Sequence, residues 1–456
     1  MESITMAISS QAKSAYCPAL FITAPSSGSG KTTVVAAMAR YWRNKGLNVR
    51  VFKTGPDYID PMFHEVASGN KAYQLDIGMM GLEACQRHLY QAAKQADLIL
   101  IEGVMGMYDG KHHSAELARQ LNVPLMAVIP ASGMAQTFGA IAYGLANYQA
   151  DTQLFGVVAN EVGSLGHAKL LQDSLPKGIA FCGSLPKNAE IALPEQHLGL
   201  TQAHELTSLD SMLNTAAKLL SKTCELPLPE PIEFSYQTNP SVAPLLKGVR
   251  VGIAKDAAFS FIYHDNVELL TKMGATISDF SPITDSKLPE VDALYLPGGY
   301  PESYQSELSN NQPMLSAIRQ HITSAKPTLA ECGGMLYLLE QFQDAHGNKA
   351  QFVGAMQGKG TLHKKLKGIG MVSANIAPTP LTGHTFHYST LDTNETSIFI
   401  ASQQGKVRAI EPVYLISKTL ASYTHWYWPS NPSFIAAVFK GEIKPSDYST
   451  TLNENT

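Results

Sequence analysis

Apolar segments that alternate with helical patterns constrain the fold of this chain more than any other feature. In the N-terminal half they read ALFIT, NVRVF, LILIE, PLMAVI and LFGVVA, at residues 19–23, 48–52, 98–102, 124–129 and 154–159. A strand that is apolar along its whole length is buried on both faces, and the helices between such strands provide the crossovers that parallel pairing requires. We therefore predict a parallel α/β sheet with helices on both faces.

The same alternation restarts in the C-terminal half, at residues 249–254, 292–299 and 327–331. Residues 225–244, between the halves, are rich in proline and show no periodicity, which is typical of an extended linker. At 456 residues the chain is also too long for one ordinary core. We therefore predict two α/β domains and a linker, at residues 18–224, 247–443 and 225–246 respectively.

The last part of the second domain has a more antiparallel pattern. Residues 383–390 read GHTFHYST, which predicts one alternating strand. From about residue 444 onward the sequence predicts a frayed C-terminal tail.

Composition narrows the class of protein. Hydrophobic residues make up 45% of the chain and charged residues 16%, which indicates a folded protein, and the net charge of −4 comes without a basic run that would follow nucleic-acid phosphates. There is no basic leader, no apolar h-region and no long apolar stretch, so we expect a soluble cytoplasmic protein that binds neither nucleic acid nor membrane. The five cysteines show no CxxC spacing, which argues against a zinc site or a disulfide framework.

A glycine-rich turn, SSGSGKTT, follows the first apolar segment and opens a helix. Small residues let backbone N–H groups converge on a phosphate, Lys31 adds a positive charge, and Thr32 can offer its hydroxyl to Mg²⁺. Pro25 replaces the usual first glycine, and a simple helix-opening turn is the alternative reading. The predicted ATP-binding residues are Ser27, Gly28, Ser29, Gly30, Lys31, Thr32 and Thr33, with Lys53 as a further residue that could face the phosphates.

Two carboxylates stand where strand ends would deliver oxygen ligands to a metal ion. Asp57 follows the second apolar segment, and Glu102 ends the third. Asp57 and Asp60 also fit a turn, because GPD and IDP are turn sequences, whereas a carboxylate that ends a buried strand needs a ligand or a partner. We therefore predict Mg²⁺ bound by Thr32, Asp57 and Glu102.

A lone cysteine, Cys332, lies in ECGG between an apolar strand and a helix. A helix N-terminus stabilises a thiolate, the Gly333 N–H could face a developing oxyanion, and Gly299 in the PGGYPE turn could supply a second donor. A buried structural cysteine is the ordinary alternative, but the ECGG context favours a nucleophile. The partner base would be a histidine, and periodicity does not choose among His264, His321, His346, His363, His384, His387 and His425.

Together these segments resemble the cobyrinic and hydrogenobyrinic acid a,c-diamide synthases. The N-terminal likeness lies in APSSGSGKTT, KTGPDYIDPMFH, QLD, EGVMGMYDG, ANEVGSLGH and LPEQHLGL, and the C-terminal likeness in AFSFIYHDN, LYLPGGYPES, LAECGGMLYL, GHTFHYS and ASYTH. The resemblance implies a P-loop, dethiobiotin synthetase-like ATPase domain followed by a class I glutamine amidotransferase domain.

The resemblance also implies an activity and residue roles. The activity is ATP- and glutamine-dependent amidation of the a and c acetate groups of cobyrinic or hydrogenobyrinic acid in cobalamin synthesis, through an acyl-phosphate attacked by ammonia. Cys332 is the implied nucleophile and His425 its base. The residues implied to face the substrate or the acyl-phosphate are Asp57, Tyr58, Ile59, Asp60 and Asp109.

The chain departs from the pattern of these synthases in four places. Related amidotransferases often carry an acidic residue two positions after the base, where this chain has Tyr427, so no orienting carboxylate is identified. Thr385 stands where the family commonly has glutamate, and Pro130 and Gln196 also replace more usual residues.

Three alternatives stay open at this point. A cobyric acid synthase-like enzyme or a nickel-sirohydrochlorin a,c-diamide synthase would keep both half-sites and change the substrate. A partition-type ATPase with a non-catalytic C-terminal domain would not need Cys332 and His425, and a purely structural module would need neither site. The segments KTGPDYIDP and EGVMGMYDG favour the a,c-diamide branch, and a homodimer is compatible with the sequence.

Overall fold

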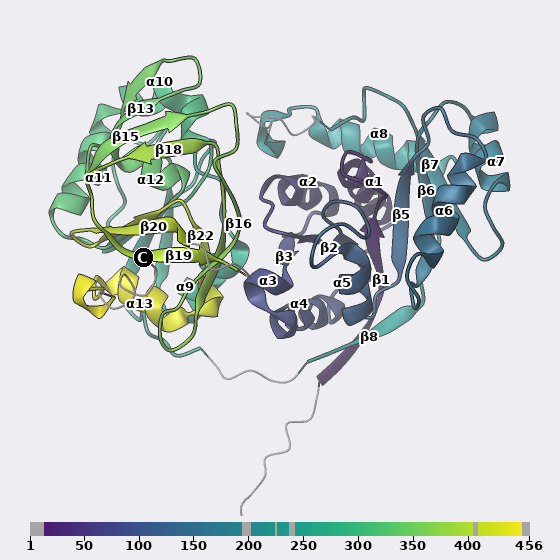
Figure 1. The fold of residues 1–456 in the computed structure, drawn as a ribbon, viewed down its shortest axis with the longest axis horizontal. Helices are drawn as coiled ribbons and strands as arrows, with labels where there is room; N and C mark the ends of the chain where they lie inside the picture. The colour runs from purple at the N-terminus through teal and green to yellow at the C-terminus, as the bar shows by residue number, and fades with distance from the viewer. Residues whose placement is uncertain (1–12, 194–201, 224–225, 237–241, 405–408, 449–456) are drawn as a thin grey trace, which may run out of the picture. The chain divides into compact units, whose positions relative to one another are not determined.

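The chain was analysed as a computed structural model, which describes residues 13–193, 202–223, 226–236, 242–404 and 409–448 (Figure 1). It divides into two compact units at residue 240, and each is described by itself. The helices of the described residues include none that is both long enough and apolar enough to cross a bilayer. The predicted Gln196 departure lies outside the described residues.

In its described residues the N-terminal unit forms an eight-stranded sheet with the order β3-β2-β4-β1-β5-β6-β7, and β8 pairs with β1. All neighbours along the seven-strand path pair in parallel. The strands are β1 (Lys13–Thr23), β2 (Val49–Thr54), β3 (Tyr73–Leu75), β4 (Leu98–Glu102), β5 (Leu125–Pro130), β6 (Leu154–Val162), β7 (Ala180–Pro186) and β8 (Pro231–Tyr236).

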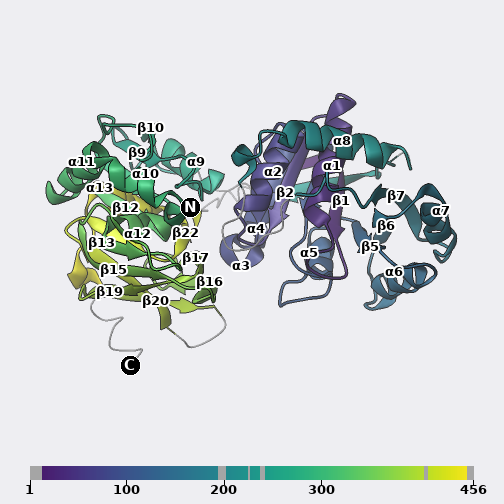
Figure 2. The ribbon, with the colours of Figure 1, turned by 90° about the horizontal axis from the view of Figure 1, so that it is seen from above.

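Helices cover both faces of this sheet (Figure 2). One face packs against α4, α5 and α6 through residues such as Phe21, Ile101 and Phe138, while α1 contacts β1, β2 and β4. The helices are α1 (Lys31–Asn44), α2 (Ile59–Ser68), α3 (Ile77–Met80), α4 (Leu82–Ala93), α5 (Ser114–Gln120), α6 (Thr137–Asn147), α7 (Leu165–Asp173), η1 (Ala203–Glu205) and α8 (Leu209–Ser221). The parallel α/β sheet predicted from the apolar segments is therefore confirmed.

The prediction of an extended linker over residues 225–246 needs a correction. Residues 231–236 of that segment form β8, which pairs antiparallel with the first half of β1. The Phe234 side chain is 4% exposed and belongs to the core, so burial of an apolar group in the sheet outweighs the local abundance of proline.

The C-terminal unit contains, in its described residues, a ten-stranded sheet and a four-stranded sheet. The large sheet has the order β10-β9-β11-β12-β21-β20-β19-β16-β17-β22, parallel from β10 to β21 and antiparallel beyond, and the small sheet has the order β14-β13-β15-β18. The strands are β9 (Arg250–Ala254), β10 (Thr276–Phe280), β11 (Ala293–Leu296), β12 (Thr328–Glu331), β13 (Leu339–Gln343), β14 (Lys349–Gln351), β15 (Met356–Leu362), β16 (Gly368–Ala374), β17 (Leu381–His387), β18 (Ser389–Asp392), β19 (Ser397–Gln403), β20 (Ala409–Ile416), β21 (Thr419–Ser422) and β22 (His425–Tyr427).

The helices of this unit lie between these strands and after them. They are α9 (His264–Lys272), η2 (Pro301–Tyr304), α10 (Gln305–Asn310), α11 (Gln312–Thr323), α12 (Gly333–Leu338), η3 (Trp428–Ser430), α13 (Pro432–Lys440) and η4 (Pro445–Asp447). The second α/β domain predicted from the sequence is confirmed.

Two local predictions in this unit are wrong. Residues 383–390 do not form one alternating strand, because β17 belongs to the large sheet and β18 to the small one. Within β17, three consecutive residues from Gly383 to Thr385 are buried, so side chains on both faces of the strand are covered and alternation is lost. The predicted frayed tail is wrong for residues 445–448, where η4 forms and the Tyr448 ring lies 5.4 Å from the Phe399 ring, and the rest of that tail lies outside the described residues.

Sheet geometry places each half-site at the carboxyl ends of parallel strands, where polar groups can gather. In the N-terminal unit the glycine-rich turn follows β1, Asp57 lies beyond the end of β2, and Glu102 ends β4. In the C-terminal unit the PGG turn follows β11 and Cys332 follows β12.

Two glycines of α6 provide a matched test of packing in the N-terminal unit. A Cβ atom on Gly139 would lie 2.0 Å from the Ser174 carbonyl oxygen, whereas a Cβ atom on Gly144 would meet nothing within 4 Å. We expect Gly139→Ala to destabilise the protein by about 1–3 kcal/mol through overpacking. Gly144→Ala should stabilise it by about 0.5–1 kcal/mol, because alanine loses less backbone entropy in a helix. Thermal unfolding measures both, and equal shifts would contradict the packing of α6 on α7.

Candidate functional site

The glycine-rich turn is shaped by contacts within the loop and from β6. Gly28 and Gly30 have φ angles of 74° and 81°, in the left-handed region that favours glycine. The Ser29 hydroxyl donates a hydrogen bond to the Ser26 carbonyl at 2.9 Å, and the Asn160 side-chain amide donates to the Ser29 carbonyl at 3.0 Å. A Cβ atom on Gly30 would lie 2.1 Å from Asn160 Nδ2, so this close approach also requires glycine.

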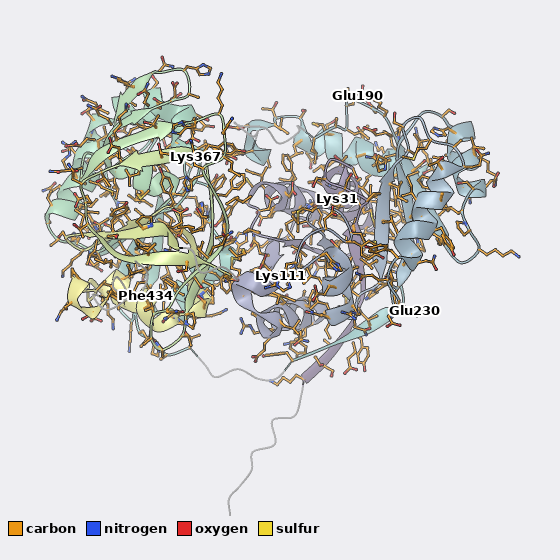
Figure 3. The ribbon with its side chains drawn as sticks, in the orientation of Figure 1. Lys31, Lys111, Glu190, Glu230, Lys367 and Phe434 are labelled. Carbon is orange, nitrogen blue, oxygen red and sulfur yellow. The ribbon has the colours of Figure 1, made fainter. Side chains whose placement is uncertain are left out.

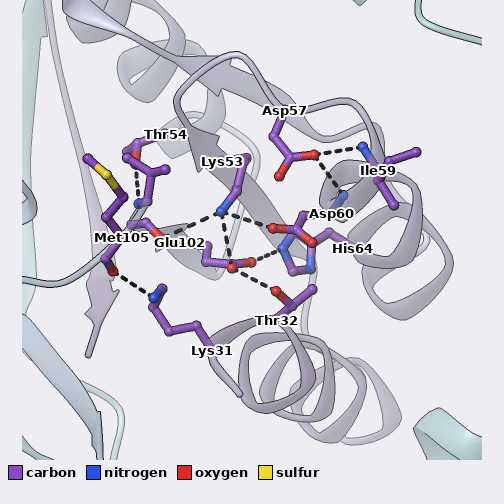
Figure 4. Close-up of polar contacts among 12 residues, drawn as sticks. Lys31, Thr32, Lys53, Thr54, Asp57, Ile59, Asp60, His64, Glu102 and Met105 are labelled. Carbon is purple, nitrogen blue, oxygen red and sulfur yellow. Dashed lines mark hydrogen bonds and ion pairs between the residues drawn. The ribbon is translucent and has the colours of Figure 1, made fainter. Parts of the chain in front are cut away.

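Lys31 begins α1 and lies in the interior of the N-terminal unit (Figure 3). Its ammonium donates to the Met105 carbonyl at 2.7 Å (Figure 4). It also donates to the Ser26 carbonyl at 3.3 Å. Burial lowers the pKa of Lys31, although the Glu102 carboxylate opposes that shift. Neutral carbonyls are weaker partners for an ammonium than phosphate oxygens, so a phosphate group can replace them.

Glu102 is the centre of a buried polar network at the end of β4 (Figure 4). Its Oε1 accepts a hydrogen bond from the Thr32 hydroxyl at 2.9 Å and forms an ion pair with Lys53 Nζ at 3.2 Å. Its Oε2 contacts His64 Nε2. Lys53 also pairs with Asp60 at 3.0 Å, so one ammonium joins two carboxylates.

The charges in this network stabilise one another. Burial by itself raises the pKa of Glu102. Lys53 and His64 lower that pKa by a larger amount, so the net shift is downward. For Lys53 burial lowers the pKa, but Glu102 and Asp60 raise it, and the net shift is upward. Burial raises the pKa of Asp60 well above its ordinary value despite the neighbouring ammonium. The charged pair is therefore Glu102 and Lys53.

The oxygen atoms of Thr32 and Glu102 are suited to Mg²⁺. Mg²⁺ takes hard oxygen ligands and commonly keeps waters and substrate phosphates beside one or two protein groups. The described residues contain no group of three or more His, Cys, Asp or Glu side chains arranged to hold a metal ion. A magnesium ion would therefore depend on the nucleotide for part of its coordination, as the glycine-rich turn allows.

The residues predicted to face the substrate lie near the start of α2. The Asp57 carboxylate accepts hydrogen bonds from the Ile59 N–H at 2.8 Å and the Asp60 N–H at 3.2 Å, as expected of a turn residue. Tyr58 and Ile59 are 8% and 5% exposed. The Asp57 bonds leave its role as a metal ligand a prediction.

Three further predicted residues lie in the nucleotide loop or close to it in the chain or in the fold. Asp109 Oδ2 accepts a hydrogen bond from the Gly106 N–H at 3.2 Å, in the loop after β4. That loop joins the glycine-rich turn, because the Met107 N–H donates to the Ala24 carbonyl at 2.7 Å. Ser27 is exposed in the turn, and Thr33 is partly exposed in α1.

In the C-terminal unit, Cys332 occupies a strained turn between β12 and α12. Its φ of 46° and ψ of −107° are unfavourable for a residue with a side chain and are typical of strain retained at functional sites. Its N–H donates to the Ser422 carbonyl at 2.8 Å. Burial raises the pKa of the thiol, and the nearby Glu302 carboxylate raises it further. The resting thiol is therefore protonated and needs a base.

Glycines bring the PGG turn against His425 and against Gly333, the residue after Cys332. A Cβ atom on Gly298 would lie 2.3 Å from Cε1 of His425. A Cβ atom on Gly333 would lie 3.1 Å from the Gly299 nitrogen, so the two predicted oxyanion donors are neighbours. The PGG turn thus lies against His425 and against the start of α12, and the roles of Cys332 and His425 stay predictions.

His425 lies in β22 and is 1% exposed. Its ring stacks on the His384 ring with centroids 4.8 Å apart, and the Tyr263 hydroxyl contacts His384 Nδ1 at 3.0 Å. Burial lowers the pKa of His425 to about 3, and His387 lowers it further. The imidazole is therefore neutral, which is the form that a general base requires.

Two residues in the N-terminal half-site were not singled out from the sequence, since His64 contacts Glu102 and Asn160 shapes the nucleotide loop. His64 lies four residues after Asp60, which places both on one helix face, so that spacing could have identified it. Asn160 acts across a long sequence separation and carries no local signal. His384, one of the seven histidines considered as the base, stacks on His425.

The departures from the family pattern also have places in the structure. Thr385 is 1% exposed and donates a hydrogen bond to Glu411 at 2.7 Å, while Glu411 also contacts His387 at 3.0 Å. Pro130 ends β5. Tyr427 ends β22 and is 2% exposed.

Comparisons with known proteins match both units. A nucleotide binding domain of the CobQ/CobB/MinD/ParA type matches residues 20–200, and a CobB/CobQ-like glutamine amidotransferase domain matches residues 250–433. Hydrogenobyrinate a,c-diamide synthases of Stutzerimonas stutzeri and Pseudomonas aeruginosa are each 48% identical over 93% of this chain, covering 99% and 98% of their own lengths. A cobyrinate a,c-diamide synthase of Herminiimonas arsenicoxydans is 42% identical over 93% of this chain and 97% of its own. The resemblance inferred from the sequence is confirmed.

The buried network around Glu102 predicts an effect on stability. Glu102→Gln should destabilise the protein by about 3–5 kcal/mol at pH 7, because the Lys53 ammonium then stays buried without the carboxylate that forms its charged pair. The pKa of Glu102 lies below its ordinary value, so its stabilisation is present above pH 4.5 and is lost as the pH falls towards 2. The free energy of unfolding, measured with urea, should therefore differ less and less between wild type and variant as the pH falls from 4.5 towards 2.

Asp210→Asn is the control for this measurement. Asp210 pairs with Arg40 but its side chain is 71% exposed, so the change should cost less than about 1 kcal/mol. A wild-type-like stability of Glu102→Gln, or a difference that is constant down to pH 2, would contradict the ion pair described above.

The contact of Gly298 with His425 predicts an effect on glutamine hydrolysis. Gly298→Ala adds a methyl group where the imidazole lies, so it should displace the base and lower kcat by about 100-fold. Glutamate release measures this rate, and Gly144→Ala in the N-terminal unit is the matched glycine-to-alanine control. An unchanged rate in Gly298→Ala would place the base elsewhere.

Proposed function

Because the chain belongs to the family of hydrogenobyrinate and cobyrinate a,c-diamide synthases, we propose that it converts the a and c acetate carboxylates of a corrin acid into amides, using ATP and glutamine. The observation that carries this proposal is 48% identity over 93% of the chain, together with a phosphate-binding turn and a cysteine–histidine site in one polypeptide. The reaction is an ATP-dependent carbon–nitrogen ligation.

The C-terminal unit releases ammonia from glutamine. The Cys332 sulfur attacks the carboxamide carbon while His425 takes the thiol proton, and the Gly299 and Gly333 N–H groups face the resulting oxyanion. The proton passes to the departing nitrogen, and ammonia leaves a thioester. Water then hydrolyses the thioester, giving glutamate and the free thiol. The neutral imidazole and the strained thiol position support these roles.

The N-terminal unit activates the acceptor carboxylate. A carboxylate oxygen of the corrin acid attacks the γ-phosphorus of ATP, ADP leaves, and an acyl-phosphate forms. Ammonia then attacks the acyl carbon and inorganic phosphate leaves with the oxygen. Lys31, Lys53 and the backbone of the glycine-rich turn bind the phosphates.

The remaining residues of this unit bind metal and substrate. Thr32, Asp57 and Glu102 would hold Mg²⁺, which supplies charge neutralisation on the phosphates when bound. Tyr58, Ile59 and Asp60 lie at the start of α2, and Asp109 lies in the loop after β4. They are proposed to face the corrin acid or the acyl-phosphate, together with Asp57.

The stoichiometry follows from the chemistry. Each amide consumes one ATP and one glutamine, so the diamide needs two rounds.

ATP and glutamine are abundant in the cytoplasm, and we place the reaction there. A homodimer is a further proposal, which light scattering of the purified protein would test.

Other glutamine-dependent tetrapyrrole amidases, of the cobyric acid or nickel-sirohydrochlorin type, would use the same two half-sites. The names of the relatives at 42–48% identity favour the a,c-diamide reaction on a cobyrinic or hydrogenobyrinic acid. A partition-type ATPase with a non-catalytic second domain is disfavoured, because it gives no reason for a strained cysteine beside a buried histidine.

Mass spectrometry of the corrin product tests the proposal. Wild-type protein with ATP, Mg²⁺ and glutamine should add two amides to cobyrinic or hydrogenobyrinic acid. Cys332→Ala should lose this activity by 1,000-fold or more with glutamine, on the order seen when a nucleophile is removed, and regain it with ammonium. Lys31→Ala should lose about 100-fold with either nitrogen source, because it removes a charge at the phosphates.

Two outcomes would contradict the proposal in different ways. Glutamine hydrolysis without a mass change on either corrin acid would keep the amidotransferase and reject the substrate. Full glutamine-dependent activity in Cys332→Ala would reject the assigned nucleophile.

A further inference from the structure

Glu331 is a buried carboxylate that the reaction described above does not use. It ends β12, immediately before Cys332, and is 1% exposed. Its Oε2 accepts a hydrogen bond from the Tyr295 hydroxyl at 2.8 Å. Its Oε1 accepts from the Trp428 indole N–H at 3.1 Å and from the Trp426 backbone N–H at 3.3 Å. Three donors thus compensate a carboxylate whose burial would otherwise be costly.

The two donors to Oε1 come from the residues that follow the proposed base. Trp426 directly follows His425 in β22, and Trp428 begins the next turn. In the sheet, β22 pairs with β17, and five strands separate it from β12 in the order of the large sheet. The backbone ladder therefore does not join the two strands directly. The Glu331 side chain does join them, through its hydrogen bonds to Trp426 and Trp428. Glu331 is the residue before Cys332, and Trp426 is the residue after His425.

The same segment is held from its other side by α9. The Asn266 side chain is fully buried, its amide donates to the Trp426 carbonyl at 2.8 Å, and its oxygen accepts from the Trp428 N–H at 2.9 Å. Residues 426–428 therefore have side-chain partners from two elements. Of the two partners, Glu331 and Asn266, only Glu331 is next in sequence to Cys332. The Cys332 N–H in turn donates a hydrogen bond to the Ser422 carbonyl.

This arrangement bears on how the imidazole is oriented. The residue two positions after His425 is Tyr427, which cannot accept a charge-assisted hydrogen bond from an imidazole as a carboxylate would. Fixing the backbone on which the imidazole is mounted is another way to set its position. A displacement of about 1 Å between reacting groups is enough to lower a rate by about 100-fold.

We propose that Glu331 is a positioning residue for glutamine hydrolysis, whose carboxylate sets the distance between Cys332 and His425 by binding the backbone and indole that follow the base. It touches neither glutamine nor the reacting atoms. This inference rests on the proposed roles of Cys332 and His425. Burial raises the pKa of Glu331 to about 7 even though its three donors lower it, which agrees with a polar group retained at a cost.

Two substitutions separate the acceptor role of Glu331 from its volume. Glu331→Gln keeps the shape and one carbonyl oxygen for Trp426 and Trp428, while its amide can donate to the Tyr295 hydroxyl, which is also an acceptor. Glu331→Leu keeps a similar side-chain volume but cannot accept a hydrogen bond. Tyr295→Phe is the matched control, because it removes the donor to Oε2 and leaves both bonds to the base segment.

The measurement is steady-state glutamate release from glutamine, with thermal unfolding of each variant. Glu331→Leu should lower kcat by about 10–100-fold with KM changed less than about 2-fold, because binding of glutamine does not depend on the base. Glu331→Gln and Tyr295→Phe should stay within about 3-fold of wild type. Ammonium-supported amidation should persist in all three, because the N-terminal unit is unchanged.

Wild-type kcat in Glu331→Leu would overturn the inference. Equal losses of kcat and of unfolding temperature in Glu331→Leu and Tyr295→Phe would also overturn it, because they indicate a general role in folding. If Glu331→Leu does not fold, Glu331→Asp, which withdraws the carboxylate by one methylene, provides the same test with the charge kept. Glutamate release that survives in Cys332→Ala would instead reject the proposed function, whatever Glu331 does.

Discussion

The N-terminal half-site depends on a sheet that admits charge only where its strands end. Ile99 and Ile101 in β4 are fully buried, and the strand ends in Glu102, which is 1% exposed. Water cannot solvate a carboxylate there, so Lys53, Thr32 and His64 must compensate it. The same contacts fix the Lys53, Thr32 and His64 side chains around the end of β4.

The C-terminal half-site obtains its order from hydrogen bonds and backbone strain. Burial keeps the Cys332 thiol and the His425 imidazole neutral, since it raises the pKa of the first and lowers that of the second. In the proposed reaction, the Cys332 thiol passes its proton to the His425 imidazole when glutamine binds. That transfer requires the two groups to be held close together, and the backbone is constrained on both sides, at the positive φ of Cys332 and at the Glu331 contacts.

Local patterns predicted the parts of both sites that local backbone chemistry controls. A glycine-rich turn between strand and helix identified Lys31 and Thr32, and ECGG after an apolar strand identified Cys332. Contacts across long separations were not predicted: Asn160 reaches a loop 131 residues away, and the base was chosen from seven histidines by resemblance alone. β8 was missed because its proline-rich sequence suggests a linker, while the buried Phe234 and the pairing with β1 outweigh that tendency.

By itself the sequence determined two α/β units and the two turns proposed for phosphate and thiol chemistry, because strand burial and glycine conformations are properties of short segments. Tertiary structure alone decided which distant groups meet those turns. Glu102 acquires Lys53 and His64 through strand order, and Glu331 meets Trp426 and Trp428 although its own strand and β22 lie far apart in the sheet. The reason is that a side-chain contact between distant segments depends on how whole sheets twist and pack, which no short stretch of residues encodes.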